Sequence, residues 1–258
     1  MYPPNVPKCL SQIQEKDSVL DIGGWALPFN RANYVMDVMP YETRGKWSGQ
    51  SPQAGQQEWF DRTTWIQRDI CDRTPFPFED KSIDYVICSH TLEDLRDPVW
   101  VCSEINRVGK RGYIEVPSRL AEQSKGIERG VVGWSHHRWL VTIDPAKNTV
   151  VFMQKYHMIH RSRRFHFPWW FWHYLSEERR VQWLFWQDQF HYEEKIVHGV
   201  QEIEFELAAF VRSHRISLAN AVASLRARDW VKVFRLLGRK ARSLMLRTHG
   251  MGRKIESA

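Results

Sequence analysis

The sequence predicts an α/β fold built on a parallel β-sheet. Apolar segments that suit buried strands recur through the first half of the chain, at Ser18–Ile22, Asn33–Val38, Trp65–Ile70, Ile83–Ser89 and Arg111–Val116. The fourth of these is continuous and rich in β-branched residues, as expected of a central strand that is buried on both faces. Strands that alternate with connecting segments in this way favour a parallel sheet.

One clear helix signal lies between the fourth and fifth of these strands. The helix is predicted to open at Asp97-Pro98, where proline suits the first turn, and to continue to about Val108 with apolar residues at helical spacing. The segment Met39–Thr64, by contrast, is polar and rich in glycine, and is predicted to be a loop with at most one helical turn.

The pattern changes after Pro117. Leu140–Ile143 and Thr149–Lys155 flank a turn and predict a β-hairpin, and Val181–Phe210 is predicted to be at least partly helical. We therefore divide the chain into residues 1–160, which carry the sheet, and residues 161–258, an aromatic and helical C-terminal extension.

The basic charge of the chain is concentrated at its C-terminal end. The net charge is +7, but residues 211–258 contain twelve Lys or Arg against two Asp or Glu, whereas residues 1–210 contain 25 against 28. A nucleic-acid-binding core is therefore not expected, and the basic surface belongs to the end of the chain.

Cysteine usage and hydropathy point to an intracellular setting. The four cysteines are dispersed without metal spacing and are expected to be small buried side chains. The first ten residues lack the features of a signal peptide, and no apolar run is long enough to span a membrane. We expect a cytoplasmic protein.

Five motifs follow one another in an informative order between residues 17 and 117. They are VLDIGG, YVMD, RDICD, the long phrase PFPFEDKSIDYVICSHTLEDLRDP, and GYIEVPS. Together they resemble the class I S-adenosylmethionine-dependent methyltransferases, in particular those with a methyltransferase type 11 domain. The resemblance implies a Rossmann-like sheet and S-adenosyl-L-methionine as the cofactor.

The resemblance assigns the first cofactor contacts to the ends of strands one and two. Asp21 would orient the amino-acid end of the cofactor, while Gly23 and Gly24 would let the backbone approach it closely. Asp37 would accept hydrogen bonds from the ribose hydroxyls. The plainer alternative is that the glycines only form a turn and the acids only cap strand ends.

Further contacts are expected after strands three and four. By the same resemblance, Asp69 would reach the adenine amino group with the Ile70 backbone alongside it. Ser89 and His90 would line the site near the reactive sulfonium. Ligands of open parallel sheets bind at the carboxyl ends of the strands, which is where these residues fall.

The glycine loop departs from the family pattern. Pro28 and the few residues between the glycines and the second strand leave room for at most one helical turn. The cofactor has no phosphate that needs a helix N-terminus, so the shortening favours a methyltransferase over a dehydrogenase. We expect Trp25–Phe29 to cover the cofactor; if they filled the cavity instead, the protein would not be an enzyme.

The acceptor is expected to meet the segment after strand five. His136 and His137 could take a proton from an acceptor hydroxyl, as could His90, and Arg138 could hold a carboxylate or phosphate. Glu115, near the end of strand five, is a further substrate-binding candidate. The alternative is that one histidine packs and the other is solvated. No metal is expected, since distant histidines such as His157 match no zinc spacing.

Two C-terminal segments combine cations with aromatic side chains. Leu225–Arg247 predicts an amphipathic helix that could lie on an anionic membrane surface or dock on the acidic body, with nucleic acid as a third alternative. Arg161–Leu175 suits a membrane interface, a sugar-stacking surface, single-stranded nucleic acid, a dimer interface or a plain core. We therefore expect a methyltransferase that acts on an oxygen, in preference to a nitrogen, of a small-molecule or glycan acceptor such as a lipid-linked sugar, working in the cytoplasm or at the inner membrane face. A non-catalytic binding protein of the same fold is the first alternative. An RNA methyltransferase is the second, although nucleic acid is the less favoured partner.

Overall fold

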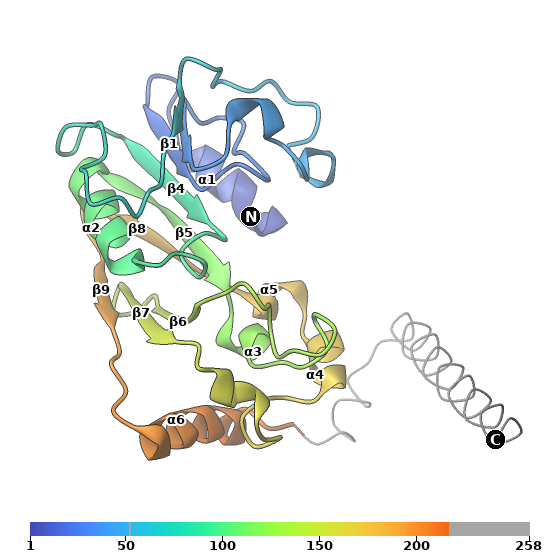
Figure 1. Ribbon diagram of the computed structural model, residues 1–258. Coiled ribbons are helices and arrows are strands. Elements are labelled where there is room, and N and C mark those ends of the chain that lie inside the picture. The colour runs from blue at the N-terminus through green and yellow to red at the C-terminus, as the bar shows by residue number, and fades with distance from the viewer. Residues whose placement is uncertain (52, 217–258) are drawn as a thin grey trace, which may run out of the picture. The chain divides into compact units, whose positions relative to one another are not determined.

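The computed structural model describes residues 1–51 and 53–216 (Figure 1). Residues Met1–Ser213 form one compact unit, and a second unit begins at His214. The expected amphipathic helix Leu225–Arg247 lies outside the described residues. Within the described part, no helix is long and apolar enough to cross a membrane.

The centre of the compact unit is a six-stranded, mostly parallel sheet with the order β3-β2-β1-β4-β5-β8 (Figure 1). Its strands are β1 (Val19–Ile22), β2 (Tyr34–Asp37), β3 (Trp65–Gln67), β4 (Tyr85–Ser89), β5 (Arg111–Pro117) and β8 (Val181–Gln187). The first five are parallel, and β8 pairs antiparallel with β5 along its whole length. The predicted α/β fold is confirmed.

The strand order reverses between β1 and β4. From β1 the chain moves outward to β2 and β3, then returns to place β4 on the other side of β1. Such a reversal opens a crevice at the carboxyl ends of the two central strands, because their following loops leave in opposite directions. The candidate site of this protein lies there.

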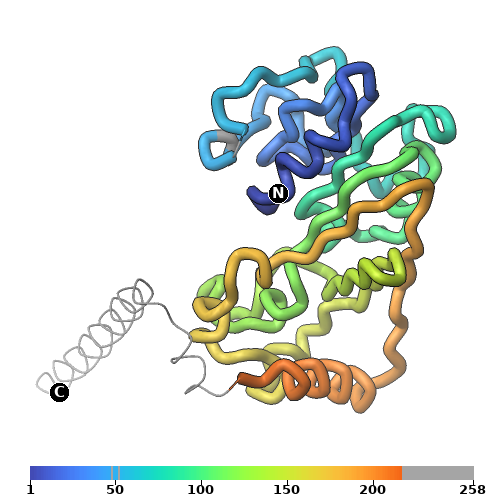
Figure 2. Tube along the Cα trace, turned by 180° about the vertical axis from the view of Figure 1, so that it is seen from behind, coloured from blue at the N-terminus to red at the C-terminus, as the bar shows by residue number. Residues whose placement is uncertain are grey.

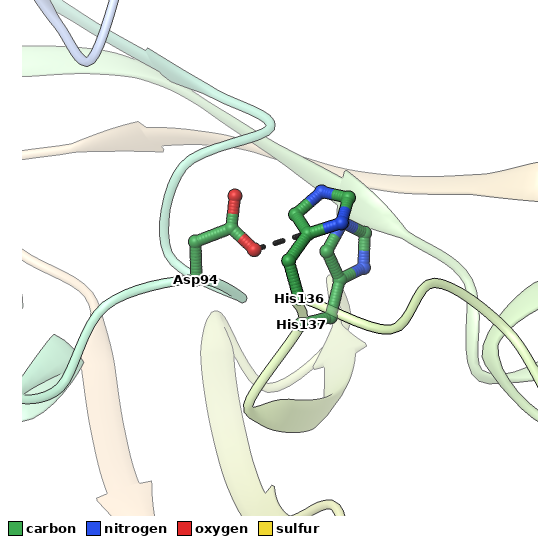
Figure 3. Close-up of side chains that lie close together, drawn as sticks. All are labelled: Asp94, His136 and His137. Atoms are coloured by element: carbon green, nitrogen blue, oxygen red, sulfur yellow. Dashed lines mark ion pairs between the residues drawn. The ribbon is translucent and has the colours of Figure 1, made fainter.

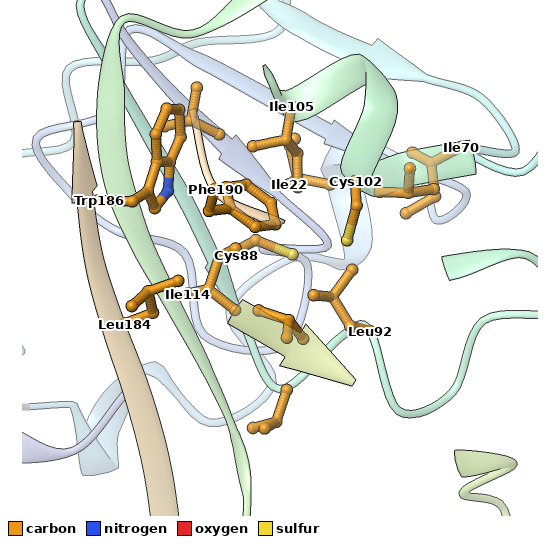
Figure 4. Close-up of a cluster of buried hydrophobic side chains, with 14 of the residues drawn as sticks. Ile22, Ile70, Cys88, Leu92, Cys102, Ile105, Ile114, Leu184, Trp186 and Phe190 are labelled. Atoms are coloured by element: carbon orange, nitrogen blue, oxygen red, sulfur yellow. The ribbon is translucent and has the colours of Figure 1, made fainter. Parts of the chain in front are cut away.

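Both faces of the sheet are buried. One face packs on α2 (Pro98–Val108), in a core that includes Ile22, Cys88, Ile105 and Trp186 (Figure 4). The other face packs on α1 (Val6–Gln12) and the loop after β1, around Val19, Phe29 and Ile87. Burial on both faces explains the continuous apolar runs of the central strands. All four cysteines are free and buried, as expected.

A smaller sheet follows the main one. It contains β6 (Trp139–Asp144), β7 (Thr149–Gln154) and β9 (His191–Glu194) in the order β6-β7-β9. The first two form the predicted hairpin, with Trp139 opposite Gln154. From β9 the chain descends to α6 (Val200–Ser213), whose Leu207 packs with residues of the hairpin (Figures 1 and 2).

The remaining elements are short. They are α3 (Arg119–Glu122), α4 (Trp169–Tyr174), α5 (Glu177–Arg180) and the 3-10 turns η1 (Pro3–Asn5), η2 (Tyr41–Thr43), η3 (Ser48–Gln50) and η4 (His157–His160). Residues 23–33, all of them described, contain no helix, so the connection from β1 to β2 is a loop. Most of the parallel sheet is therefore joined by loops and 3-10 turns, which shortens the walls around its carboxyl edge.

The range Val181–Phe210, predicted to be at least partly helical, is helical only in its last part. Residues 181–187 form β8 and residues 191–194 form β9, and the helix begins only at Val200, after Gly199. Aromatic and β-branched side chains suit a pleated β-sheet. In addition, β8 forms backbone hydrogen bonds with β5 along its whole length, a long-range pairing that the sequence alone does not reveal. The compact unit therefore continues across residue 160, where the sequence analysis divides the chain, to Ser213.

Packing of β5 against β4 depends on the absence of a side chain at Gly112. A Cβ at this position would lie 2.2 Å from the Val86 carbonyl oxygen, whereas a Cβ at Gly49 would meet nothing within 4 Å. We expect Gly112→Ala to lower the free energy of unfolding by about 1–3 kcal/mol and Gly49→Ala to change it by less than about 0.5 kcal/mol. Urea unfolding of the two variants checks this. Equal stabilities would contradict the described contact between β4 and β5.

Candidate active site

A cavity of about 420 Å³ lies at the carboxyl ends of β1 and β4. Its volume falls within the range of about 300–1,000 Å³ that is usual for small-molecule sites. The predicted site residues on its wall are Asp21, Gly23, Gly24, Ser89 and His90. The structure therefore brings together the part of the predicted site that belongs to the two central strands.

The two glycines of the loop allow the chain to turn tightly against its neighbours. Gly23 has a φ of +74°, and a Cβ there would lie 2.2 Å from Thr91 Oγ1. A Cβ on Gly24 would lie 2.2 Å from Asp21 Oδ2. A larger residue at Gly23 would have to displace Thr91, and one at Gly24 would have to displace the Asp21 carboxylate on the cavity wall.

The Asp21 carboxylate is almost fully buried at the base of this loop. Its Oδ2 accepts a hydrogen bond of 2.8 Å from the Phe29 amide. Burial raises the pKa of Asp21 to about 7, against the opposing effect of that hydrogen bond. A cationic group beside a buried carboxylate stabilises its ionised form, and the ammonium of an amino acid is such a group.

Four residues of the segment Trp25–Phe29 form a wall of the cavity and do not fill it. Ala26, Leu27, Pro28 and Phe29 all line the cavity, and the Trp47 amide donates to the Ala26 carbonyl. The loop before β3 therefore closes over the shortened glycine loop. The expectation that these residues cover a bound ligand fits this arrangement.

Gln53 supplies an unused donor on the same wall. Its side chain is 2% exposed, and its Oε1 accepts from the Asn30 amide at 2.7 Å. Its Nε2 has no hydrogen-bond partner among the described residues, although it is buried. A buried amide without a partner is rare and points to a ligand acceptor in the adjoining cavity.

Asp37 occupies the end of β2 but is not on the cavity wall. Its Oδ2 accepts from the Trp25 amide at 3.1 Å and its Oδ1 from the Met39 amide at 2.8 Å. Burial raises its pKa. Each oxygen of a carboxylate has a second lone pair, so Asp37 keeps the capacity to accept from a ribose hydroxyl.

Asp69 and Ile70 lie apart from the cavity. Asp69 borders a separate hollow together with Arg96, whose guanidinium donates to Asp69 Oδ2 at 2.5 Å. Although burial acts to raise the pKa of Asp69, that hydrogen bond lowers it. Ile70 is 6% exposed and belongs to the hydrophobic core. The residues predicted to contact the adenine therefore lie away from the cavity that holds the residues predicted to contact the amino-acid end.

His90 is held in an unusual backbone conformation by two acids. Its φ is +55°, its Nε2 lies 2.9 Å from Glu115 Oε1, and its Nδ1 lies 3.5 Å from Glu93 Oε1. Burial acts to lower the pKa of His90, but the two carboxylates raise it to about 9. The raised pKa favours the protonated form of His90, which is less suited to act as a general base, and its catalytic role stays a prediction.

Glu115, expected to contact the acceptor, is instead completely enclosed. Its carboxylate accepts from the Tyr2 amide at 2.8 Å, from the Tyr113 hydroxyl and, at 3.4 Å, from the Ser89 hydroxyl. Burial acts to raise the pKa of Glu115, but His90 lowers it to about 2. Glu115 is thus a permanent anion that positions His90, with no exposed surface for a substrate.

The segment His136-His137-Arg138 packs against the loop after β4. The Arg138 amide donates to the Glu93 carbonyl at 2.8 Å, which ties the segment to the loop that carries His90. The side chain of Arg138 is exposed and forms no ion pair within the described part of the chain. Its role in holding an anionic acceptor stays a prediction.

His137 is the more strongly positioned of the two histidines. Its Nδ1 lies 2.5 Å from Glu122 Oε1, and Glu122 Oε2 accepts from Lys155 Nζ at 2.7 Å. The His137 Nε2 lies 3.7 Å from Asp94 Oδ1 (Figure 3). His136 is exposed beside it, with the two rings nearly perpendicular. Burial acts to lower the pKa of His137, but Glu122 and its acidic neighbours raise it.

Several residues of this region escaped the sequence analysis. They are Trp47, Gln53, Glu93, Asp94, Glu122 and Lys155. The length of the loop before β3 was one available signal, because long loops in compact domains are usually functional. The position of Glu93 and Asp94 directly after a central strand was another.

The comparisons with known proteins agree with this architecture. Residues 23–114 match the family model described as a methyltransferase domain. A search of curated protein sequences gave no match.

Three similar solved structures are S-adenosylmethionine-dependent methyltransferases. One from Aquifex aeolicus is 18% identical over 45% of this chain and 65% of its own, with a TM-score of 0.30. One from Mesorhizobium loti is 13% identical over 57% and 62%, with a TM-score of 0.32. The arsenic(III) methyltransferase of Chlamydomonas reinhardtii is 19% identical over 45% and 50%, with a TM-score of 0.28. The match thus spans between half and two thirds of the length of these proteins.

Residues 23–114 match the model of a methyltransferase domain, and they lie on a sheet with the strand order of a class I, Rossmann-like fold. S-Adenosylmethionine is the cofactor of such a domain. The cavity at β1 and β4, with its buried acid and its unused amide donor, fits the amino-acid end of that cofactor.

The raised pKa of Asp21 makes cofactor affinity depend on pH. With a pKa of about 7, Asp21 is mostly protonated at pH 6 and mostly ionised at pH 8, and only the ionised form attracts an ammonium. We expect the dissociation constant of S-adenosylhomocysteine to fall about tenfold over this range, in proportion to the competent fraction. Calorimetry at several pH values measures it. Asp21→Asn should flatten the profile, whereas the exposed Asp80→Asn should keep it; a flat profile in the unchanged protein would contradict the role of Asp21.

Proposed function

We propose that this chain transfers the methyl group of S-adenosylmethionine to an oxygen of a small-molecule or glycan acceptor. The observation that carries the proposal is the cavity at the switch point of the sheet. Its wall is formed by Asp21 and the glycines at the carboxyl end of β1, and by Ser89 and His90 at the carboxyl end of β4. The loop that carries His90 is hydrogen-bonded to the segment that carries the candidate acceptor residues.

Each end of the site has residues suited to its part. Asp21 and Gln53 would hold the charged amino-acid end of the cofactor. The bound cofactor supplies an electrophilic methyl group. Asp37 and Asp69 remain the candidates for the ribose and adenine ends. A methyl transfer depends chiefly on such positioning, because the two reacting groups must approach in line.

An oxygen nucleophile must also lose its proton. His90 is less suited because Glu115 and Glu93 favour its protonated form. His137 is the other candidate: Glu122 orients its ring and leaves Nε2 on the side of Asp94, and its pKa is also raised by these acids, so it would have to lose its own proton before it could take one from the acceptor. The exposed Arg138 next to it favours an acceptor that carries a carboxylate or phosphate, as a lipid-linked sugar does.

A second candidate is a binding protein that has kept the fold but lost the reaction. One observation favours it: the backbone amides of Trp25 and Met39 already occupy one lone pair on each oxygen of Asp37. Such a protein would bind the cofactor without transferring its methyl group.

Labelling separates these functions. The purified protein is incubated with radiomethyl S-adenosylmethionine and an extract of the source cells, which is then divided into glycan, lipid, RNA and protein fractions. We expect label in the glycan or lipid fraction, and an Arg138→Ala variant should lose most of it while binding S-adenosylhomocysteine normally. Arg129→Ala, at another exposed arginine, should label as the unchanged protein does. Label confined to RNA, or cofactor binding without label, would contradict the proposal.

Cofactor binding itself is sensitive to the glycine loop. Gly23→Ala should weaken binding of S-adenosylhomocysteine at least tenfold, because the new Cβ would strike Thr91 and Gly23 already has a positive φ. Gly130→Ala is the matched control, since Gly130 has a φ of +90° but open space around its Cβ position. Calorimetry compares the two. Equal affinities of the two variants would contradict the proposal that the glycine loop contacts the cofactor.

A further inference from the structure

We propose that Asp94, His136 and His137 bind a divalent transition-metal ion, of which Zn²⁺ is the best fit. The binding itself is independent of the proposed function, and only the role of the ion rests on it. Two imidazoles and one carboxylate are a ligand set that borderline metals prefer, whereas Mg²⁺ and Ca²⁺ prefer oxygen alone.

The distances are close to those of a metal site. One ligand atom from each of the three residues lies within 4.8 Å of the other two (Figure 3). Ligands about 2.0–2.1 Å from a tetrahedral ion lie roughly 3.3 Å from one another. The His137 Nε2 and Asp94 Oδ1 atoms, 3.7 Å apart, need little movement. The His136 side chain is 59% exposed, and to move inward it would give up only a long contact of 3.8 Å between its Nδ1 and Glu128 Oε1.

The surroundings of His137 resemble those of a metal-bound imidazole. Metal-ligating histidines almost always hold a carboxylate or carbonyl with their second ring nitrogen, which fixes the tautomer and the ring orientation. In this protein Glu122 holds Nδ1, and Lys155 fixes Glu122 from its other oxygen. The Trp134 ring stacks on the imidazole with centroids 5.0 Å apart. The Nε2 atom is thereby held toward Asp94.

Two acids near these histidines lack the partners that burial normally requires. Asp94 Oδ1 is buried and has no hydrogen-bond partner among the described residues. The same is true of both oxygens of Glu93, which is 1% exposed and whose closest cation is His90 Nδ1 at 3.5 Å. Buried carboxylate oxygens without partners are rare and costly, and a nearby cation would compensate their charge.

Three protein ligands leave one tetrahedral position open, as in catalytic zinc sites. An acceptor hydroxyl bound there would have a lowered pKa. Its O–H bond would break with the electron pair kept by oxygen, and the proton would pass to water. The cluster would thus generate the nucleophile that the proposed methyl transfer requires.

Metal binding is measured without cofactor or acceptor. Tag-free protein is freed of metal with a chelator and titrated with Zn²⁺ by calorimetry. We expect one ion per chain, with affinity reduced at least tenfold in His137→Gln, Asp94→Asn and the exposed His136→Asn. Glu122→Gln should weaken binding about 10–100-fold through His137. His157→Asn, at an exposed histidine in η4, should bind as the unchanged protein does. Absence of binding, or equal affinity in His136→Asn and His157→Asn, would overturn the site.

A spectroscopic probe identifies the ligands more directly. Co²⁺ bound by two imidazoles and a carboxylate in tetrahedral geometry absorbs in the visible range, and the bands should vanish in His136→Asn. Binding of S-adenosylhomocysteine should be equal in His136→Asn and the unchanged protein, so the two proposals fail separately. Labelling of an acceptor by metal-free protein at the full rate would contradict the metal and leave His137 as the base.

Discussion

The contact between the buried Glu115 carboxylate and the partly exposed His90 ring is the interaction on which the geometry of the site depends. Glu115 lies at the end of β5, and His90 is the first residue after β4. His90 makes this contact from a left-handed backbone conformation, and the contact favours the charged form of both groups. The same loop then carries Glu93, whose carbonyl receives the backbone of the segment His136-His137-Arg138. The loop that holds this ion pair thus connects the cofactor cavity with the candidate acceptor residues.

A second constraint follows from the loss of the helix after β1. A helix would have supplied its own backbone hydrogen bonds; the loop needs other partners. The Asp21 carboxylate accepts a hydrogen bond from the Phe29 amide, and the Asp37 carboxylate accepts one from the Trp25 amide. The Trp47 amide donates to the Ala26 carbonyl. The acids that the family resemblance assigns to the cofactor therefore also hold the loop in place. Because Asp21 also holds the loop, its carboxylate is buried and its negative charge is only partly compensated by the Phe29 amide.

The sequence was sufficient for the elements whose patterns are local. Strand-like runs and helical spacing located the central strands, α2 and the hairpin, and the glycine loop located one end of the cavity. The pairing of β8 with β5 was missed because it joins residues about seventy positions apart and its aromatic side chains have no clear alternation. The approach of Asp94 to His137 could not be predicted either, since it depends on how two loops pack. Polar loop residues such as Gln53 carry no periodicity that would reveal their burial.

The central claim is that the cavity at β1 and β4 holds the cofactor although the adjoining helix is missing. A crystal structure of the protein with S-adenosylhomocysteine tests it most directly. The account predicts the amino-acid end of the ligand beside Asp21 and Gly23, with residues 26–29 against it. A ligand bound elsewhere, or a cavity closed by residues 26–29 while the ligand is excluded, would contradict it.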